Sequence, residues 1–550
     1  MKNNMIQIIE TTANAVSIDL TTRDVALKKG TQALMLAPGF SDLAPDEVSA
    51  AMLSLSQQIV SRYNINLDKS QAALKWKMPV NIEPFQLAMV LVERHHAINV
   101  VYVDSDDKAC EIALYDENEG IYVVNDTYIM REILAYSISA NRSYTDEVFA
   151  QLRALAPRRE RTTDRDLIPV NNGIFDYKTK QLLPFSPDFV FLAKSRTNYN
   201  PNAANPVIQN ADGTSWDVES WMQDLTDDEE ITNLFWEITG ALLRPNVSWD
   251  KSAWLYSDRG ENGKGTLCAL WRNLCGSSAT SIPIADFAKD FMLSSLITSQ
   301  AIIVDENDVG TFIDKAGDLK AVITNDVIYI NRKHKDPIPY QFHGFMVQCL
   351  NELPRFKDKS DSIYRRQLFI PMSKCFTGKA NVDIKKDYIN RPEVLEYVMK
   401  RVLEMDYYKL SEPEACKFVL EEYKTYNDPV RQFWAEFEDQ FVWDFIPYTF
   451  LFSLFKSWFK QNNPSGSIMG RNTFMKDLRN VVSNSQIFGL TDPEGAKIRV
   501  GNMMDKTETL IATYNLTDWQ TPGMNSSTAA TVEALCRPHI LDRMAGIVRK

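Results

Sequence analysis

Apolar and polar positions follow different spacings along the chain, and each spacing predicts a different kind of element. Apolar residues three or four apart between 48 and 59 predict a helix, which Pro45 and two acidic residues begin. This helix packs within its own domain or contacts a second subunit. From about 76 to 200, short apolar runs between acidic turns predict strands, at 100–103, 110–115 and 120–124. The chain therefore starts helical and becomes mixed α/β.

Changes in pattern and composition divide the chain further. Asn, Pro and Gly gather at 199–216 and predict a linker, and a helical stretch follows at 218–243. At 550 residues the chain is too long for one core, so we expect several domains. The expected regions are an N-terminal helical region (1–75), a mixed α/β domain (76–200), a linker and helical collar (201–244), a nucleotide-binding domain (245–375), a helical connector (376–427), a small C-terminal domain (428–520) and a tail (521–550). The tail contains Pro, Gly, Asn and Ser, and we expect it to be loosely held.

A glycine-rich loop lies between a strand-like run at 253–256 and a helix-like run at 267–271. Glycines let backbone N–H groups approach an anion, and the start of a helix adds partial positive charge. Lys264 is placed to reach the outer phosphates of a nucleotide. The residues expected around the phosphates are Gly260, Asn262, Gly263, Lys264, Gly265 and Thr266. Taken alone, such a loop is often only a turn.

Two further apolar runs end in polar residues suited to nucleotide hydrolysis. The run 301–304 delivers Asp305 and Glu306 to its C-terminal edge, where Mg²⁺ and a lytic water would lie. The run 346–350 ends in Asn351, which is suited to orient that water, although a lone Asn often only forms a turn. With the loop, in this order, these features predict a nucleoside triphosphatase.

Two basic clusters complete this region. Arg365 and Arg366 precede a strand-like run, and one of them is suited to act as an arginine finger on a neighbouring subunit's nucleotide; a surface ion pair is the alternative. Alternating apolar residues from 328 lead into a predicted hairpin with a cationic tip, formed by Arg332, Lys333, His334 and Lys335. The tip is suited to contact nucleic-acid phosphates, or is a solvated loop.

This order of motifs resembles the superfamily 3 helicases, and most of all their phage and poxvirus-type primase-helicase branch. The resemblance rests on the loop, Asp305-Glu306, the basic hairpin, Asn351-Glu352-Leu353-Pro354 and Arg365-Arg366. It implies an AAA+-like parallel sheet, a homo-hexameric ring with ATP and Mg²⁺ at shared sites, and single-stranded DNA in the channel, followed 3′ to 5′.

The same resemblance assigns roles to single residues. Lys264 becomes the Walker A lysine, Asp305 the Mg²⁺ ligand, Glu306 the base and Asn351 sensor 1. Lys333 and His334 match the pair on the DNA-tracking hairpin. Asp258 and Gly265 depart from the common pattern, since the family usually has Gly at the first and the general loop has Ser or Thr at the second. Thr266 is then the candidate hydroxyl ligand of Mg²⁺.

The C-terminal domain has its own predicted architecture. Helices at 448–460 and 471–482, a break at 464–466, and a strand pair at 498–501 and 509–514 predict a winged helix. Its second helix carries Arg471, Lys476 and Arg479, which are suited to contact a DNA groove. Because helix-turn-helix shapes are unspecific, a protein-binding winged helix is the equal alternative.

Composition narrows the functional classes. The net charge of −12 argues against a protein that coats nucleic acid along its whole surface, while it permits a local basic channel. Seven scattered cysteines predict reduced thiols, and their spacing with five histidines forms no zinc motif. The N-terminus shows no signal peptide, and the apolar stretch 441–459 is interrupted by Asp444, Pro447 and Lys456. We expect no membrane association and a place in the bacterial host cytoplasm.

The combined prediction is a multidomain α/β protein, an ATP-dependent replicative DNA helicase of a phage or mobile genetic element. It acts on single-stranded DNA and on forked or origin DNA. No zinc ribbon or paired-carboxylate constellation for nucleotidyl transfer is visible, so we expect a separate primase or replisome partner. The alternatives are an AAA+ motor that works away from a fork and an origin-binding initiator in which ATP controls assembly.

Overall fold

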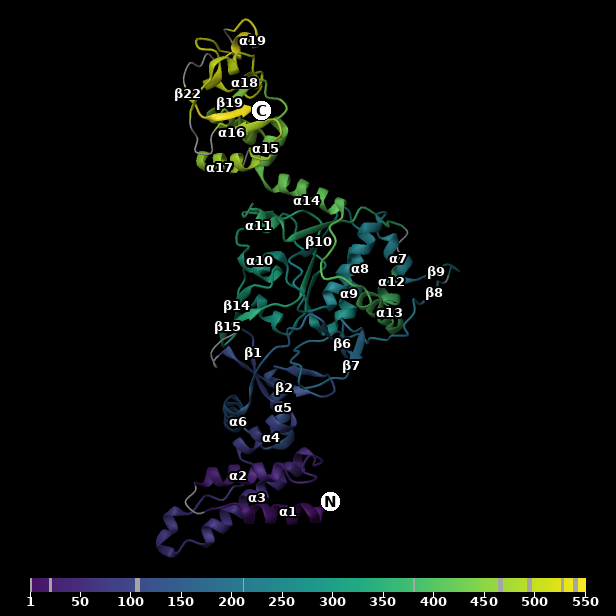
Figure 1. The fold of residues 1–550 in the computed structure, drawn as a ribbon, viewed down its shortest axis with the longest axis vertical. Coiled ribbons are helices and arrows are strands. Elements are labelled where there is room, and N and C mark those ends of the chain that lie inside the picture. The colour runs from purple at the N-terminus through teal and green to yellow at the C-terminus, as the bar shows by residue number, and fades with distance from the viewer. Residues whose placement is uncertain are drawn as a thin grey trace. The chain divides into compact units, whose positions relative to one another are not determined.

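The computed structural model describes residues 2–18, 22–103, 109–210, 212–378, 381–462, 468–491, 497–525, 529–537 and 543–550. They form two compact units. The first unit comprises residues 1–352 and 365–413, and the second, which we call the C-terminal unit, comprises residues 353–364 and 414–550. Figure 1 shows the elements of each.

The first unit begins with three helices that pack on one another, α1 (Lys2–Ala15), α2 (Arg23–Met35) and α3 (Pro45–Ile65). The predicted helix start is confirmed in α3, where Pro45 occupies the first turn and the Glu47 side chain accepts a hydrogen bond from the Ala44 N–H at 3.2 Å. The spaced apolar residues, among them Met52 and Leu55, are fully buried in a core shared with α1 and α2. The amphipathic pattern therefore supports packing within this unit.

The strands predicted after this region are also present. A four-stranded sheet has the order β3-β2-β1-β4, with antiparallel pairs except for the parallel pair β1–β4. Its elements and those around it are α4 (Pro84–Arg94), β1 (Ile98–Val101), β2 (Glu111–Asp116), β3 (Ile121–Val123), α5 (Asp126–Tyr136), α6 (Arg142–Leu155) and β4 (Arg158–Glu160). A second small sheet follows, with β5 (Leu167–Val170), β6 (Gly173–Asp176) and β7 (Gln181–Leu183).

The stretch predicted as a linker contains a short hairpin, β8 (Ile208–Gln209) and β9 (Ser215–Trp216). The helical stretch predicted at 218–243 is present as two helices, α7 (Val218–Asp224) and α8 (Glu229–Leu243). The break is explained by Asp228, whose carboxylate accepts hydrogen bonds from the N–H groups of Glu230 and Ile231 and so begins α8.

A five-stranded parallel sheet forms the centre of the first unit. Its order is β11-β12-β16-β10-β18, and every neighbouring pair is parallel. The strands are β10 (Ser252–Tyr256), β11 (Ala279–Thr280), β12 (Ala301–Val304), β16 (Phe345–Leu350) and β18 (Gln367–Pro371). All residues of β12 and β16 are buried, as parallel strands covered on both faces require. The prediction of an α/β fold with a parallel sheet is confirmed.

Helices α8, α9 (Lys264–Cys275) and α13 (Pro392–Leu403) pack against one another, and α8 and α9 contact the sheet. The remaining elements of this unit are β13 (Phe312–Ile313), α10 (Gly317–Ile323), β14 (Val327–Arg332), β15 (Lys335–Gln341) and α12 (Val382–Lys386). Short 3₁₀ turns also occur at Lys69–Leu74, Gly276–Ser278, Ile284–Asp286, Met292–Thr298 and Tyr388–Asn390.

The C-terminal unit is built around an aromatic core in which Phe433, Phe455 and Phe474 lie in mutual ring contact. Its helices are α11 (Asp361–Tyr364), α14 (Glu414–Asn427), α15 (Pro429–Phe437), α16 (Tyr448–Asn462), α17 (Arg471–Val482), α18 (Leu510–Thr513) and α19 (Val532–Leu535), with 3₁₀ turns at Gly501–Met504 and Thr517–Trp519. Its strands are β17 (Arg355–Phe356), β19 (Phe445–Pro447), β20 (Phe488–Leu490), β21 (Ile498–Arg499), β22 (Arg543–Met544) and β23 (Gly546–Arg549).

Two predictions for this unit were wrong. The segment 509–514, predicted as the second wing strand, contains α18, because its backbone hydrogen bonds close within the segment: the Thr513 N–H donates to the Thr509 carbonyl oxygen at 3.1 Å and the Tyr514 N–H to the Leu510 carbonyl oxygen at 3.0 Å. The partner of β21 is instead β22. The tail, expected to be loosely held, supplies β23, the middle strand of a β19-β23-β20 sheet. The predicted break at 464–466 lies outside the described residues.

Candidate active site and nucleic-acid surfaces

The parallel sheet brings three predicted site segments to one edge. Strands β12, β16 and β10 are neighbours, so their C-terminal ends lie side by side. Asp305 follows β12, Asn351 follows β16, and the glycine-rich loop 257–263 follows β10. A sheet of this kind binds ligands outside the carboxyl ends of its strands. Segments about ninety residues apart in the chain therefore meet in a single site.

The loop has the backbone conformation of an anion-binding turn. Gly263, the residue before α9, has a φ of +85°, and Glu261 also has a positive φ, of 55°. Alternation of right- and left-handed residues turns successive N–H groups toward one point. Asn262 is 4% exposed and closes the loop from inside, since its amide donates to the Arg259 carbonyl oxygen at 2.6 Å. Gly260 is exposed, and the half-buried Thr266 lies in the first turn of α9.

Lys264 is the most constrained charged group of the site. It is 6% exposed, and its ammonium donates to Asn351 Oδ1 and to the Leu350 carbonyl oxygen, both at 3.0 Å. A third hydrogen bond reaches the Ser257 carbonyl oxygen at 3.3 Å. Burial lowers the pKa of Lys264, while the nearby Asp305 opposes that shift. The predicted Walker lysine and the predicted sensor thus contact each other directly.

Gly265 is explained by the position of Asp305. A Cβ atom at 265 would lie 3.2 Å from Asp305 Oδ1 and 3.3 Å from Lys385 Nζ. A serine or threonine here would crowd the carboxylate, so glycine lets Asp305 approach the start of α9. Lys385, in α12, was not predicted, and it adds a cation beside the loop. Lys385 lies 120 residues after Gly265 in the chain, so no local sequence pattern connects it with the loop.

Glu306 is exposed beside Asp305, whereas the next residue is an anchor that sequence reasoning missed. Asn307 is 8% exposed and donates to Gln348 Oε1 at 2.9 Å and to the Cys349 carbonyl oxygen at 3.0 Å. It also accepts a hydrogen bond from the Ile284 N–H at 2.9 Å. Asn307 therefore fixes the segment that carries both carboxylates against β16.

A pair of thiols lies beneath the loop. The spacing of the cysteines in the sequence did not predict this pair. Cys268 Sγ and Cys349 Sγ are 3.3 Å apart, and both lie near the Asp305 carboxylate. The hydrogen bond between the thiols and their burial raise the pKa of Cys349 well above its usual range. Both cysteines are free thiols buried in the packed interior beside α9.

The two candidate arginine fingers differ in exposure. Arg365 is exposed, whereas Arg366 is 9% exposed and its carbonyl oxygen accepts a hydrogen bond from the Ser252 N–H at 2.9 Å. Arg366 therefore directly precedes β18, and its backbone takes part in the pairing of β18 with β10. Arg365 is the member of the pair that a second molecule can reach.

The predicted basic hairpin is formed by β14 and β15, and Val327 pairs with Gln341 at its open end. Lys333 and His334 make the turn and are exposed, and His334 has a φ of 60°. No ion pair of Lys333 is present among the described residues. These two residues are the part of the tip that is accessible to a ligand.

The other two cations of the tip are held by carboxylates of β2 and α5, in the preceding α/β region. Arg332 forms an ion pair with Glu111, and the two side chains are only 10% and 12% exposed. Lys335 Nζ lies 2.9 Å from Asp126 Oδ2. Tyr102 donates to the second Glu111 oxygen at 2.7 Å, and burial raises the pKa of this tyrosine. Arg332 and Lys335 thus face protein groups in this structure.

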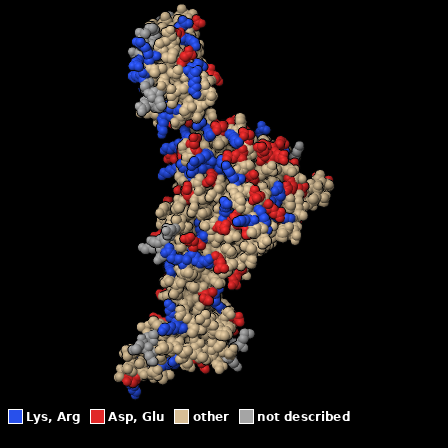
Figure 2. All heavy atoms as spheres, viewed as in Figure 1, with Lys and Arg blue, Asp and Glu red and all other residues tan. Residues whose placement is uncertain are grey.

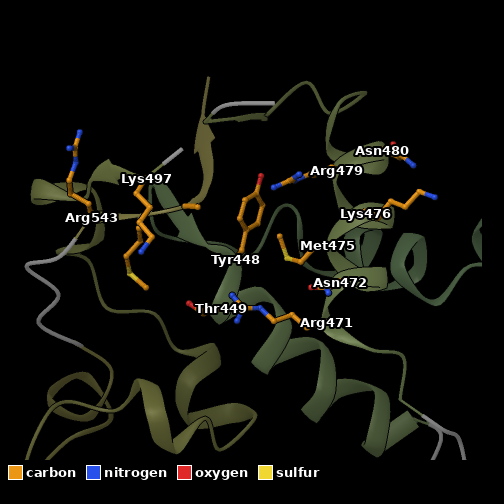
Figure 3. Close-up of a pocket in the computed structure, with 12 residues that line it drawn as sticks. Tyr448, Thr449, Arg471, Asn472, Met475, Lys476, Arg479, Asn480, Lys497 and Arg543 are labelled. Carbon is orange, nitrogen blue, oxygen red and sulfur yellow. The ribbon is translucent and has the colours of Figure 1, made fainter. Parts of the chain in front are cut away.

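Arg471, Lys476 and Arg479 lie on α17 of the C-terminal unit, as predicted. They line a hollow of about 670 Å³. Figure 2 shows basic side chains over the surface of this unit, and Figure 3 shows the hollow itself. The predicted second wing strand is absent from the described segment 509–514, so the opposite wall of the hollow comes from β21 and β22.

The fold and site define a multidomain α/β protein with a glycine-rich anion loop at the edge of a parallel sheet. Three family models match parts of the chain. A D5 N terminal like family matches residues 125–244, a family of unknown function (DUF5906) matches residues 255–366, and a Poxvirus D5 protein-like family matches residues 425–509. The two D5 matches, on either side of the loop-bearing sheet in the sequence, support a D5-like family for this chain.

Comparison with other proteins adds distant likenesses only. No curated protein matches the sequence. A solved apo structure of the NrS-1 C-terminal region, in its A form, is similar with a TM-score of 0.42 and 13% identity, and the match covers 85% of this chain and 100% of that chain. Two structures of a shorter NrS-1 C-terminal region have TM-scores of 0.40 and 0.41 at 14% identity and cover 76% of this chain and 97% of theirs.

Among the described residues, no helix combines the length and apolar character needed to cross a bilayer.

Proposed function

We propose that the protein is an ATP-hydrolysing motor that moves along single-stranded DNA, a replicative helicase of the D5-like kind with an AAA+-like core. The observation that carries this proposal is the meeting of Lys264, Asn351 and Asp305 at one sheet edge, around a loop shaped for phosphate. The D5 matches on either side of this sheet support a role in viral or phage-type DNA replication.

In this proposal each residue has a defined task. Lys264 gives up its hydrogen bonds to the carbonyl oxygens and to Asn351 and binds the outer phosphates of ATP. The negative charge of the phosphates then offsets the cost of burying the Lys264 ammonium. Asn351 then orients the attacking water, and Glu306 accepts the proton of that water. The exposed Asp305 carboxylate, with Thr266 as a second oxygen ligand, suits Mg²⁺, which prefers oxygen donors. The ion would neutralise phosphate charge when bound.

The proposed assembly is a homo-hexameric ring with an ATP site at each subunit interface. Arg365 is the proposed finger, because it is exposed while Arg366 is built into the sheet edge. A guanidinium supplied by a neighbouring subunit couples hydrolysis to the neighbour's position. The exposed Lys333 and His334 are the proposed DNA contacts within the ring, and Arg332 with Lys335 holds the hairpin. Priming is left to a partner protein.

Strand displacement tests this function directly. DNA duplexes with a 3′ or a 5′ single-stranded tail are incubated with ATP and Mg²⁺ and with the wild-type chain or the Lys264→Ala variant. We expect unwinding of the 3′-tailed duplex only, abolished in the variant, because the loop no longer has its buried cation. DNA-stimulated ATP hydrolysis without unwinding of either substrate would contradict the helicase and favour an initiator or a motor that works away from a fork.

An origin-binding initiator is the second candidate function. The observation in its favour is the concentration of cations in the C-terminal unit, which does not carry the ATP loop. Base-specific binding of duplex DNA that requires α17, by a chain that shows no strand displacement, would support the initiator.

A further inference from the structure

The hollow of the C-terminal unit is lined by five cations. Arg471, Lys476 and Arg479 come from α17, Lys497 precedes β21, and Arg543 begins β22. The start of α16, with Tyr448 and Thr449, forms the floor (Figure 3). No Asp or Glu is among the described lining residues, although the whole chain has a net charge of −12. The hollow is therefore a local exception to the charge of the chain.

These cations form no ion pairs with the described residues. None of the five forms one within the described part of the chain, whereas Lys506 and Arg549 of the same unit both pair with Asp444. Arg479 lies over the Tyr448 ring at 5.4 Å, and its buried Nε has no hydrogen-bond partner among the described groups. The buried hydroxyl of Thr449 likewise has none. A buried polar atom without a partner is costly, and here two of them border one hollow.

The geometry of the hollow selects one strand over a duplex. A helix that reads a major groove stands out from its domain, so that the groove closes around it. Here the basic side of α17 faces Lys497 and Arg543 across the hollow, and Figure 3 shows Arg471 turned toward Thr449 and Arg479 toward Tyr448. The volume of about 670 Å³ suits a small ligand or a short segment of one strand.

The start of α17 adds a further attraction for phosphate. Its N-cap is Gly470, which provides no side-chain cap, so the first N–H groups of the helix remain available beside Arg471. Tyr448 is only 3% exposed, which leaves little ring surface for base stacking. Recognition in this hollow therefore depends on the backbone of the ligand more than on its bases.

We propose that this hollow binds the sugar-phosphate backbone of a single DNA strand, without base specificity, as a second strand-holding site of the chain. The proposal takes DNA as the polymer from the proposed function, and its geometry does not depend on ATP hydrolysis. A site of this kind would hold one separated strand while the ring acts on the other.

The test measures DNA binding by the 550-residue chain without nucleotide. Its result therefore does not depend on whether the protein hydrolyses ATP. Fluorescence anisotropy follows a labelled oligothymidylate and a labelled mixed-sequence duplex, in a Lys333→Ala/His334→Ala background that removes the hairpin's DNA-binding side chains. We expect the added pair Arg471→Ala/Lys497→Ala to weaken oligothymidylate binding by about tenfold or more. The slope of the logarithm of the binding constant against the logarithm of the salt concentration should also decrease in magnitude, by about 0.7 for each phosphate that the variant no longer neutralises.

Two controls keep the result interpretable. Lys506→Ala removes a cation from the same unit outside the hollow, and we expect no change in binding. Arg543→Ala, at an exposed position on the other wall, provides a second test if the double variant loses its thermal transition. Weakened duplex binding with unchanged oligothymidylate binding would overturn the proposal in favour of a groove reader. Unchanged binding of both would overturn it outright, and absent ATP hydrolysis in the wild type would contradict only the motor.

Discussion

At the residue scale, partners at close range explain why the site departs from the common loop pattern. Gly265 stands where many phosphate loops have a hydroxyl residue, and the space for its side chain lies 3.2 Å from the Asp305 carboxylate. Lys264, buried among carbonyl oxygens and Asn351, is held near the position where phosphate is expected. Both observations are consistent with a site preorganised for an anion and a cation side by side.

We predict that His343 makes the first unit sensitive to acid. Burial, with the nearby Arg161 cation, lowers its pKa to about 4. The unfolded chain, with an ordinary value near 6.5, binds more protons between these two values, so stability falls as the pH decreases from about 6.5 to about 4. Between pH 7.5 and pH 5 we expect the free energy of unfolding to fall by about 2 kcal/mol, which thermal unfolding at a series of pH values measures.

The His343→Gln variant should show a weaker dependence on acid than the wild type. His334→Gln, which alters an exposed histidine, serves as the matched control and should keep the wild-type dependence. Equal acid sensitivity in His343→Gln and the wild type would show that protonation of other groups, such as the half-buried His95, dominates.

At the element scale, the hairpin is braced by the small sheet that precedes it. The Arg332–Glu111 pair is nearly buried, and Arg161 donates to Tyr340 Oη at 2.9 Å and to the Gln341 carbonyl oxygen at 2.7 Å. Removing one member of a buried pair leaves the other charge uncompensated, at a cost of about 3–5 kcal/mol. We infer that this brace sets the position from which the hairpin acts.

A double-mutant cycle tests the brace. We expect Glu111→Gln and Arg332→Gln each to lower the maximal rate of DNA-stimulated ATP hydrolysis, with little change in the DNA concentration for half-maximal stimulation. Because both act through one contact, the double variant should be no worse than either single variant. Asp126→Asn disturbs an exposed pair, worth about 1 kcal/mol or less, and should have a small effect. Additive losses, with a raised half-maximal DNA concentration in Arg332→Gln, would show instead that Arg332 contacts DNA.

The elements that could be predicted from the sequence are those specified by neighbours in the chain. Strands β10, β12 and β16 are apolar runs that end in polar residues, and the loop before α9 carries its own glycines. The segment around Leu510 has the composition of a strand, yet its backbone hydrogen bonds close locally and form α18. The brace joins residues 221 apart, and only the assembled fold brings them together.

At the scale of the whole molecule, the proposed ring requires that one subunit complete the site of the next. Arg365 is exposed and Lys264 is buried, so the two groups are suited to belong to different subunits at one interface. Each of the variants Lys264→Ala and Arg365→Ala should then lose ATP hydrolysis by itself, the second by a factor of about 10³ or more. Arg365→Ala should keep its folded structure, since Arg365 is exposed, and the thermal transition of Lys264→Ala is measured beside it because Lys264 is buried.

Mixing the two inactive variants provides the decisive measurement. In a mixed ring, an interface is active when two conditions are met. The subunit that binds the nucleotide is the Arg365→Ala variant, which keeps Lys264. The subunit that supplies the finger is the Lys264→Ala variant, which keeps Arg365. Random mixing of equal amounts gives this arrangement at about one quarter of interfaces, so about a quarter of the wild-type rate should return. The matched control mixes Lys264→Ala with the wild type: every interface then has Arg365 and half of the interfaces have Lys264, so about half of the wild-type rate should remain. No recovery from the first mixture, although both variants form mixed rings by native mass spectrometry, would exclude Arg365 as a finger supplied between subunits.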